Sequence, residues 1–252
     1  MNRFIVGRNP VMEALRAGTS IETILLSTSV RGRFAADLRR EARRHGVVVK
    51  AVPPDYLRRQ VGTGTHQGVV AVASAWSYVP LEEILRRAKA ADTPALVVIL
   101  QGVQDPQNLG SIIRTAEALG VHGIVIPKRR AVGVTPTVTK ASAGAAEHLP
   151  IAVVTNVART LSYLKEAGLW IVGAEAGTGT LTWEVDLTVP LAVVLGSEGK
   201  GISRLVRETC DFLVEIPMGG KLNSLNVSVA AGIMLYEVMR QKRSLGHGHW
   251  RP

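Results

Sequence analysis

A run of apolar residues leads directly into a polar, glycine-rich loop in the stretch Leu191-Ala192-Val193-Val194-Leu195-Gly196-Ser197-Glu198-Gly199-Lys200-Gly201. The five apolar residues do not alternate with polar ones, which is typical of a strand buried on both faces of a parallel sheet. Glycine permits positive φ and a close approach of a ligand to the backbone, although a sharp turn from strand to helix would use the same glycines. Open α/β folds bind ligands at the carboxyl ends of their strands, so this stretch predicts such a fold with a ligand site around Glu198.

A second polar loop separates the strand-like residues 213–217 from a long apolar helix predicted over residues 227–239. It carries four polar side chains, Asn223, Ser224, Asn226 and Ser228. Capping of the helix explains one Ser or Asn but not the whole cluster. The cluster therefore indicates ligand contact through side chains and exposed backbone amides.

A third segment begins a helix that Gly120 ends, and it reads Asp105-Pro106-Gln107-Asn108-Leu109-Gly110-Ser111-Ile112-Ile113-Arg114-Thr115-Ala116. Asn108 suits the N-cap of this helix, and the same geometry would present free N–H groups and the positive end of the helix dipole to a phosphodiester. Arg114 stands among small and apolar neighbours and needs a partner if it is buried. Either a structural ion pair or a substrate phosphate meets that requirement.

Strands alternate with helices in two parts of the chain. The predicted strands lie at 21–26, 47–52, 68–73, 95–100, 123–126, 169–173 and 191–195. The first two strands flank a helix at 32–45, which predicts a β-α-β unit in a small N-terminal α/β module. The later strands predict a mostly parallel sheet covered on both faces by helices. We therefore divide the chain into an N-terminal domain at 1–75, a linker at 76–93 and a second α/β domain at 94–252.

The chain is strongly basic, with 30 Lys and Arg against 20 Asp and Glu. Residues 1–92 hold 15 of these basic side chains and 8 of the acidic ones, so the excess lies mainly in the N-terminal third. A basic field attracts polyanions, most commonly nucleic acid, although an exposed helix face would carry the same charges. A membrane surface has less support, because the apolar stripe within residues 31–44 is narrow and suits packing on a sheet. The candidate RNA contacts are Arg8, Arg39, Arg40, Arg43 and Arg44.

Composition argues against several classes of protein. The one cysteine, Cys210, permits neither a disulfide within the chain nor a zinc cage of cysteines, and we assign it to packing. No apolar run reaches the roughly 18 residues of a membrane span, and the N-terminus lacks the apolar core of a signal peptide. We therefore expect a soluble, cytoplasmic protein without a bound metal.

Two glycine loops imitate nucleotide sites. Gly199-Lys200 does not complete a phosphate loop, because Gly201 stands where a Ser or Thr would bind magnesium. Gly177-Thr178-Gly179 follows a strand but lacks the third glycine of a dinucleotide site. We assign this second loop to a connection rather than to the main cofactor site.

The three polar segments, taken in order, resemble the motifs of the SpoU (TrmH) family of RNA ribose 2'-O-methyltransferases. The first motif matches residues 105–116, the second matches 195–201, and the third matches 216–218 together with 224–230. Residues 6–15 and 66–69 are similar to the RlmB subgroup, which modifies a guanosine of large-subunit (23S) ribosomal RNA. The N-terminal domain then resembles the ribosomal-protein-like RNA-binding domain of that subgroup.

This resemblance implies methyl transfer from S-adenosylmethionine to the ribose 2'-hydroxyl of that guanosine. The residues implied at the cofactor are Gly196, Ile216, Met218 and Leu225. The residues implied around the reacting ribose are Asn108, Arg114, Glu198, Ser224 and Asn226. Family proposals make the arginine a general base, but a guanidinium pKa above about 12 leads us to favour phosphate anchoring and charge stabilisation for Arg114.

The family fold further implies a C-terminal trefoil knot, a homodimer and no metal in the reaction. Two alternatives stay open. A sister enzyme acting on transfer RNA would share the cofactor and the chemistry. A non-catalytic RNA-binding protein would explain the basic N-terminal domain but would not need the three polar loops.

Overall fold

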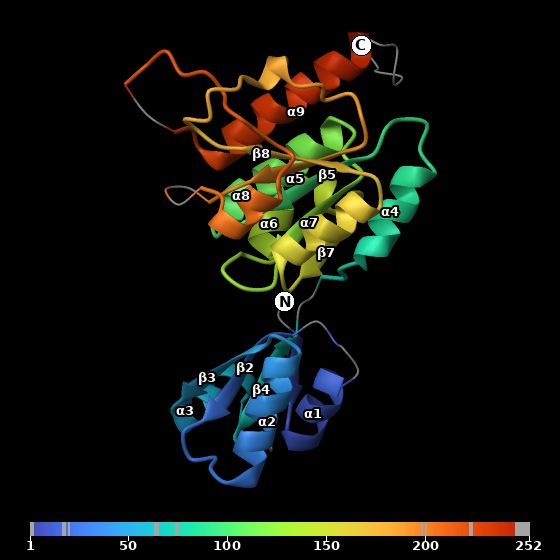
Figure 1. The fold of residues 1–252 in the computed structure, drawn as a ribbon. Helices are drawn as coiled ribbons and strands as arrows, with labels where there is room; N and C mark the ends of the chain where they lie inside the picture. Colours follow the sequence, from blue (N-terminus) through green and yellow to red (C-terminus); the bar gives the residue numbers. More distant parts are fainter. Residues whose placement is uncertain are drawn as a thin grey trace. The chain divides into compact units, whose positions relative to one another are not determined.

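The computed structural model describes residues 3–16, 19, 21–62, 66–73, 76–197, 199, 201–221 and 224–244. The chain divides into two compact units, Met1–Ser77 and Tyr78–Pro252. Each unit is built around one sheet with helices packed against it (Figure 1). Within the described ranges, no helix is long and apolar enough to cross a membrane.

The first unit has a four-stranded sheet with the strand order β1-β4-β2-β3. Its elements are β1 (Arg3–Val6), α1 (Arg8–Arg16), β2 (Ile21–Ser27), α2 (Arg33–Arg44), β3 (Val48–Val52), α3 (Pro54–Val61) and β4 (Val69–Ala73). Strands β2 and β3 pair in parallel around α2, which confirms the predicted β-α-β unit. Val11 of α1 and Leu38 of α2 are buried in one apolar cluster, and Leu57 of α3 is buried in a second.

The second unit has a six-stranded sheet with the order β10-β8-β9-β5-β6-β7, and every pair in it is parallel. Its strands are β5 (Leu96–Leu100), β6 (Gly123–Pro127), β7 (Ile151–Val154), β8 (Trp170–Ala174), β9 (Leu191–Leu195) and β10 (Phe212–Val214). Its helices are α4 (Leu81–Lys89), α5 (Pro106–Ala118), α6 (Pro136–Ala141), α7 (Val157–Glu166), α8 (Arg204–Thr209) and α9 (Val227–Ser244), with short 3-10 turns at Ala145–Glu147 and Thr182–Glu184. The predicted parallel α/β fold is confirmed.

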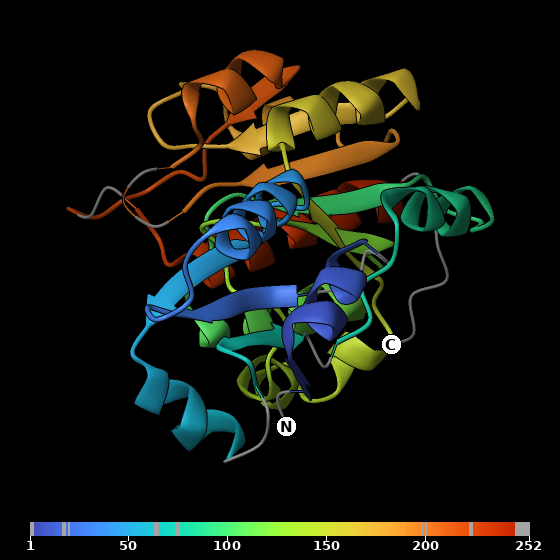
Figure 2. The same ribbon diagram turned by 90° about the horizontal axis from the view of Figure 1, so that it is seen from below.

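Helices cover both faces of this second sheet. On one face, Ile84 of α4, Leu161 of α7 and Val206 of α8 belong to one buried cluster, and α7 and α8 lie side by side (Figure 2). On the other face, α5 packs against both α6 and α9. Helix α4 falls within residues 76–93, and its Ile84 and Leu85 are buried in the core of the second unit.

The order of the strands reverses between β5 and β9. From β5 the chain adds β6 and β7 outward on one side, whereas β9, β8 and β10 lie on the other. All residues of β5 and β9 are buried, which explains their uninterrupted apolar sequences. Loops that leave such a switch point diverge and open a crevice at the carboxyl ends of the strands. The two loops beyond Leu100 and Leu195 are therefore expected to border a site.

Lysine 242 is an exception in the apolar interior. Its side chain is 4% exposed and its Nζ donates to the carbonyl oxygen of Pro94 at 2.9 Å. Burial lowers the pKa of Lys242 from 10.5 to about 8. The pKa of the nearby His122 is also lowered, mainly by burial and in part by the positive charge of Lys242.

We predict that the stability cost of Lys242 shrinks as the pH rises. Between pH 8 and 10.5 the unfolded chain binds more protons than the folded one, so the free energy of unfolding rises with pH in that window. Lys242→Met should therefore be more stable than the wild type near pH 7, and this difference should fall by about 2 kcal/mol by pH ~10. Chemical denaturation at several pH values measures it. Lys89→Met at an exposed position is the control, and an equal difference at all pH values would contradict the prediction.

Candidate ligand-binding and catalytic site

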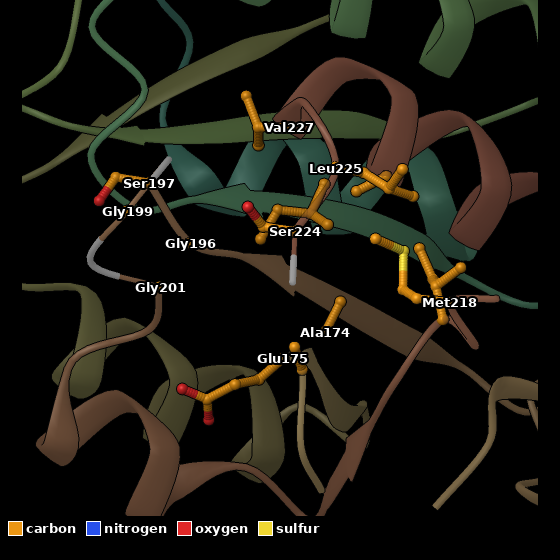
Figure 3. Close-up of a pocket in the computed structure, with 14 residues that line it drawn as sticks. Ala174, Glu175, Gly196, Ser197, Gly199, Gly201, Met218, Ser224, Leu225 and Val227 are labelled. Carbon is orange, nitrogen blue, oxygen red and sulfur yellow. The ribbon is translucent and has the colours of Figure 1, made fainter. Parts of the chain in front are cut away.

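An apolar cavity of about 420 Å³ lies at the carboxyl ends of β8, β9 and β10 (Figure 3). Four of the residues that line it are those predicted at a cofactor, Gly196, Ile216, Met218 and Leu225. The glycine loop after β9 lies on one side of the cavity, and Met218 and Leu225 lie on the other. Ser224 lines the same cavity, although the sequence placed it at the ribose.

The wall made by the loop after β9 depends on glycine. A Cβ on Gly196 would lie 2.2 Å from the carbonyl carbon of Gly201, so no other residue fits there. The turn is closed by the Gly201 N–H, which donates to the Ser197 oxygen at 2.9 Å. Gly199 has φ +81°, which favours glycine for conformational reasons. Glu198, the predicted site residue in this loop, lies outside the described residues, as does Lys200.

The loop after β8 forms another part of the cavity wall, through Ala174, Glu175 and Ala176. The Glu215 carboxylate fixes this loop, because it accepts from the N–H groups of Gly177 at 2.7 Å and Thr178 at 2.9 Å. The sequence analysis assigned Gly177-Thr178-Gly179 to a connection rather than to the main cofactor site, and the residues of this loop that line the cavity are the three that precede these glycines. Its missing third glycine excluded a dinucleotide site, but a wall of this cavity needs only a well-fixed backbone beside β9.

Glu175 is held in place by an ion pair. Its carboxylate accepts from Nε of Arg207 at 2.7 Å and also from the second guanidinium nitrogen. This interaction raises the pKa of Arg207, so the guanidinium stays charged. Arg207 comes from α8, which begins soon after the glycine loop, so the pair ties the two walls of the cavity together.

Two of the predicted ribose residues meet, although 118 positions separate them. Nδ2 of Asn226 donates to Oδ1 of Asn108 at 3.0 Å. Oδ1 of Asn226 accepts from the N–H of Ser228 at 2.8 Å, so the side chain of Asn226 is oriented from both ends. The third segment and the second polar loop therefore form one polar cluster beside the apolar cavity.

The expected N-cap of α5 was wrong. Asp105 occupies that position, and its carboxylate accepts from the N–H groups of Gln107 at 3.2 Å and Asn108 at 3.3 Å. Pro106 follows at the first helical position, where its fixed φ and missing N–H are tolerated. The N–H of Asn108 is thus occupied, and what Asn108 offers to a ligand is its side chain.

Arg114 is exposed, so it does not need the partner that burial would require. It lies on the exposed surface of α5 and lines neither the apolar cavity nor a second cavity at the carboxyl ends of β5, β6 and β7. Six residues after Asn108, it points about 240° further around the helix. Within one chain, the structure therefore does not bring Arg114 to the Asn108–Asn226 pair.

A second, more polar cavity of about 960 Å³ lies at the carboxyl ends of β5, β6 and β7. Asn108 lines it, and the residues shared with the apolar cavity are Ser197, Gly201 and Val227. Gln101 fixes its floor, because its Nε2 donates to Oγ of Ser203 at 2.7 Å and its Oε1 accepts from the N–H of that serine at 3.0 Å. Two further lining residues that the sequence analysis missed are Arg129 and Arg130.

The candidate RNA contacts of the first unit differ in their surroundings. Arg8 stacks over the ring of Phe34 at 4.9 Å and its Nε donates to the oxygen of Gln67 at 3.3 Å, so it has a structural role. The four arginines of α2, Arg39, Arg40, Arg43 and Arg44, line a shallow hollow with Ala36. Arg40 pairs with Asp37 and Arg44 with Glu41. In the described part of the chain, Arg39 and Arg43 have no carboxylate partner.

Cys210 behaves as a packing residue. Burial raises the pKa of its thiol to about 11, which keeps it protonated. Among the side chains that the structure describes, no three His, Cys, Asp or Glu residues gather in a way that could hold a metal ion.

Comparisons with known proteins cover both units. Residues 95–236 match the SpoU rRNA Methylase family, and residues 4–79 match the RNA 2'-O ribose methyltransferase substrate binding family. A relative from Bacillus subtilis, named "Putative TrmH family tRNA/rRNA methyltransferase YacO", is 47% identical over 243 residues, which is 96% of this chain and 97% of that protein.

Solved structures with the same fold include two that hold S-adenosylmethionine. The SpoU methyltransferase AviRb from Streptomyces viridochromogenes in complex with AdoMet has a TM-score of 0.61 and 30% identity, over 96% of this chain and 90% of that chain. An AdoMet-bound rRNA methyltransferase from Sinorhizobium meliloti has a TM-score of 0.59 and 26% identity, over 94% of this chain and 86% of that chain.

We predict that Gly196→Ala destabilises the second unit through the contact with Gly201. Overpacking of this kind costs about 1–3 kcal/mol, which corresponds to a fall in Tm of several degrees. Gly219→Ala is the matched control, because a Cβ there meets nothing within 4 Å. Thermal unfolding of both variants measures the difference, and equal Tm values would show that the loop can move away from position 196 at little cost.

Proposed function

Because the chain belongs to the SpoU family of RNA methyltransferases, we propose that it transfers a methyl group from S-adenosylmethionine to the ribose 2'-hydroxyl of a guanosine in large-subunit (23S) ribosomal RNA. One observation carries this proposal: the apolar cavity adjoins a larger polar cavity, and they share Ser197, Gly201 and Val227. A cofactor and a polar substrate held in adjacent sites can bring their reacting atoms together at the shared boundary.

The apolar cavity suits S-adenosylmethionine. Ile216, Met218 and Leu225 offer apolar surface for an adenosine, and a Cβ at Gly199, which also lines the cavity, would meet nothing within 4 Å. When bound, the cofactor supplies an electrophilic methyl group on a sulfonium. Displacement at such a carbon needs alignment more than covalent help, so the rigidity of the walls matters most. The Glu215 and Arg207 contacts provide that rigidity.

The polar cluster would orient the ribose. The Asn108–Asn226 pair can donate and accept hydrogen bonds but cannot remove a proton, because amides do not titrate in this range. For Arg114 we propose phosphate anchoring and charge stabilisation, since a guanidinium is a poor base. The proton of the ribose 2'-hydroxyl must also be removed. The two rival candidates for the base are the Glu198 carboxylate and Arg114.

The position of Arg114 supports a homodimer. It lies outside both cavities of its own chain, and the next residue, Thr115, lies against Gly232 of α9. Helix α9 exposes Val229, Ile233 and Tyr236 by 50%, 39% and 57%, at the spacing of one helical face. We propose that a second copy covers this face and that Arg114 of the partner subunit completes each site. By the family fold, we also propose that the C-terminal segment forms a trefoil knot.

Ribosomal RNA is the favoured substrate because the likeness extends over both units. The rRNA methyltransferase from Sinorhizobium meliloti aligns with 94% of this chain, so the alignment includes most of the N-terminal unit. Transfer RNA is the second candidate, because the Bacillus subtilis relative is named for both RNAs.

We predict methyl transfer to a guanosine 2'-oxygen of 23S ribosomal RNA. Labelled S-adenosylmethionine is offered with ribosomal RNA and, separately, with bulk transfer RNA. Arg114→Ala should lower kcat by roughly 10²- to 10³-fold, as loss of a charge-stabilising donor does, while the Kd for the cofactor stays unchanged. Label on transfer RNA would identify transfer RNA as the substrate in place of ribosomal RNA. If the folded protein binds no S-adenosylmethionine, the result would favour a non-catalytic RNA-binding protein.

We predict that mixing two inactive variants restores activity. In Arg114→Ala the cavities are intact, whereas Asn226→Ala keeps Arg114 but loses the ribose cluster. After subunit exchange, half of the dimers pair the two variants and each has one complete site, so activity should return to about one quarter of the wild-type value. If Arg114 acts within its own chain, the mixture stays inactive.

A further inference from the structure

Three consecutive cations, Lys128, Arg129 and Arg130, follow β6, and this run of three side by side in the chain distinguishes them from the other cations of the second unit. Arg207, Arg240 and Lys165 each pair with a carboxylate. Lys128, Arg129 and Arg130 have no carboxylate within ion-pair distance among the residues that the structure describes. Neighbouring cations repel one another, so an unpaired run of this kind is a natural binding site for an anion.

The run of cations is held in a fixed place. The N–H of Lys128 donates to the oxygen of Val154 at 2.8 Å, and the N–H of Val132 donates to the oxygen of Val103 at 2.9 Å. These two bonds attach the loop to β7 on one side and to the loop after β5 on the other. The backbone of Arg129 and Arg130 is therefore anchored at the rim of the polar cavity, and both residues line it.

Arg130 has a backbone conformation that arginine rarely adopts, with φ +58°. Glycine would adopt this conformation without strain, so the backbone gives no reason for an arginine at position 130. Strain retained at a non-glycine residue points to a function of its side chain. The lowered pKa of Lys128, due to burial and then to Arg129, agrees with a locally crowded positive field.

The remaining charged group of the cavity does not neutralise these cations. Asp105 lines the same cavity, but its carboxylate already accepts from two backbone N–H groups at the start of α5. None of the residues found to line the cavity is aromatic, so stacking is not the main means of holding a base there. The cavity instead combines two guanidinium groups with amide side chains, and guanidinium groups bind phosphate through paired hydrogen bonds.

We propose that Arg129 and Arg130 form a phosphate clamp for the RNA strand, and that the polar cavity receives the target nucleotide withdrawn from its stack. This inference rests on the proposed function and adds the residues that hold the substrate. The clamp would bind the backbone beside the target, and Asn108 in the same cavity would then face its ribose. A nucleotide must leave a duplex to be modified, and a fixed phosphate contact limits where it can go.

The test compares two double variants with the same change in charge. Arg129→Gln/Arg130→Gln removes the clamp. Lys89→Gln/Arg243→Gln removes two exposed cations that line neither cavity. The Kd of a 23S ribosomal RNA fragment is measured between about 50 and 200 mM salt, together with the Kd of S-adenosylmethionine. The clamp variant should bind RNA at least roughly tenfold more weakly, and the slope of log K against log salt should fall by about 1–2. Its affinity for the cofactor should not change.

A single variant separates side-chain function from backbone structure. Arg130→Gly relieves the backbone strain at positive φ. The Tm of this variant should therefore be equal to that of the wild type or up to a few degrees higher, while its affinity for RNA should fall. Equal RNA affinity in the clamp variant and the Lys89/Arg243 control would overturn the proposal, and so would a selective loss of cofactor binding, which would assign the arginines to the cofactor. If wild-type protein binds RNA but transfers no methyl group, the proposed function fails, while the RNA affinities still decide the clamp.

Discussion

The approach of Gly196 to Gly201 is the constraint on which the rest of the site depends. The two backbones are so close that a single methyl group between them would lie 2.2 Å from a carbonyl carbon. This contact closes the loop that follows the central strand β9 and turns its backbone toward both cavities. Because β9 pairs with β5 and β8, the loop meets the loops that follow these two strands. The contact between Gly196 and Gly201 therefore helps to position the loops after β9, β5 and β8, which form walls of the two cavities.

The two cavities divide the chemistry between them. The apolar cavity is bounded by backbone and by side chains such as Met218, which favour a ligand with a large uncharged part. The polar cavity holds the amides and guanidinium groups that suit an RNA backbone. Their common boundary at Ser197 and Val227 is where atoms from the two ligands would meet. Methyl transfer needs such a boundary more than it needs a strong acid or base.

The sequence predicted what depends on local pattern and missed what depends on strand order. The unbroken apolar run 191–195 identified β9, and the glycines after it predicted a loop whose residues line both cavities. Asp105 and Pro106 carried the true signal for the start of α5, and the helical period already turned Arg114 away from Ile112, Ile113 and Ala116. By contrast, the loop after β8 reaches the cavity only because β8 lies beside β9, and Arg129 and Arg130 reach theirs only because β6 lies beside β5. No period in the sequence encodes these neighbours.

The placement of charge follows from what each wall must do. Glu175 in the wall of the apolar cavity pairs with Arg207 of α8, and this bidentate ion pair fixes the loop after β8 against that helix. A surface pair of this kind adds little to stability, and its value lies in geometry. In the proposed clamp the partner of Arg129 and Arg130 is a phosphate of the substrate, and water solvates these exposed guanidinium groups at small cost until RNA binds. A carboxylate placed beside them would gain almost nothing in the free protein and would compete with phosphate in the complex.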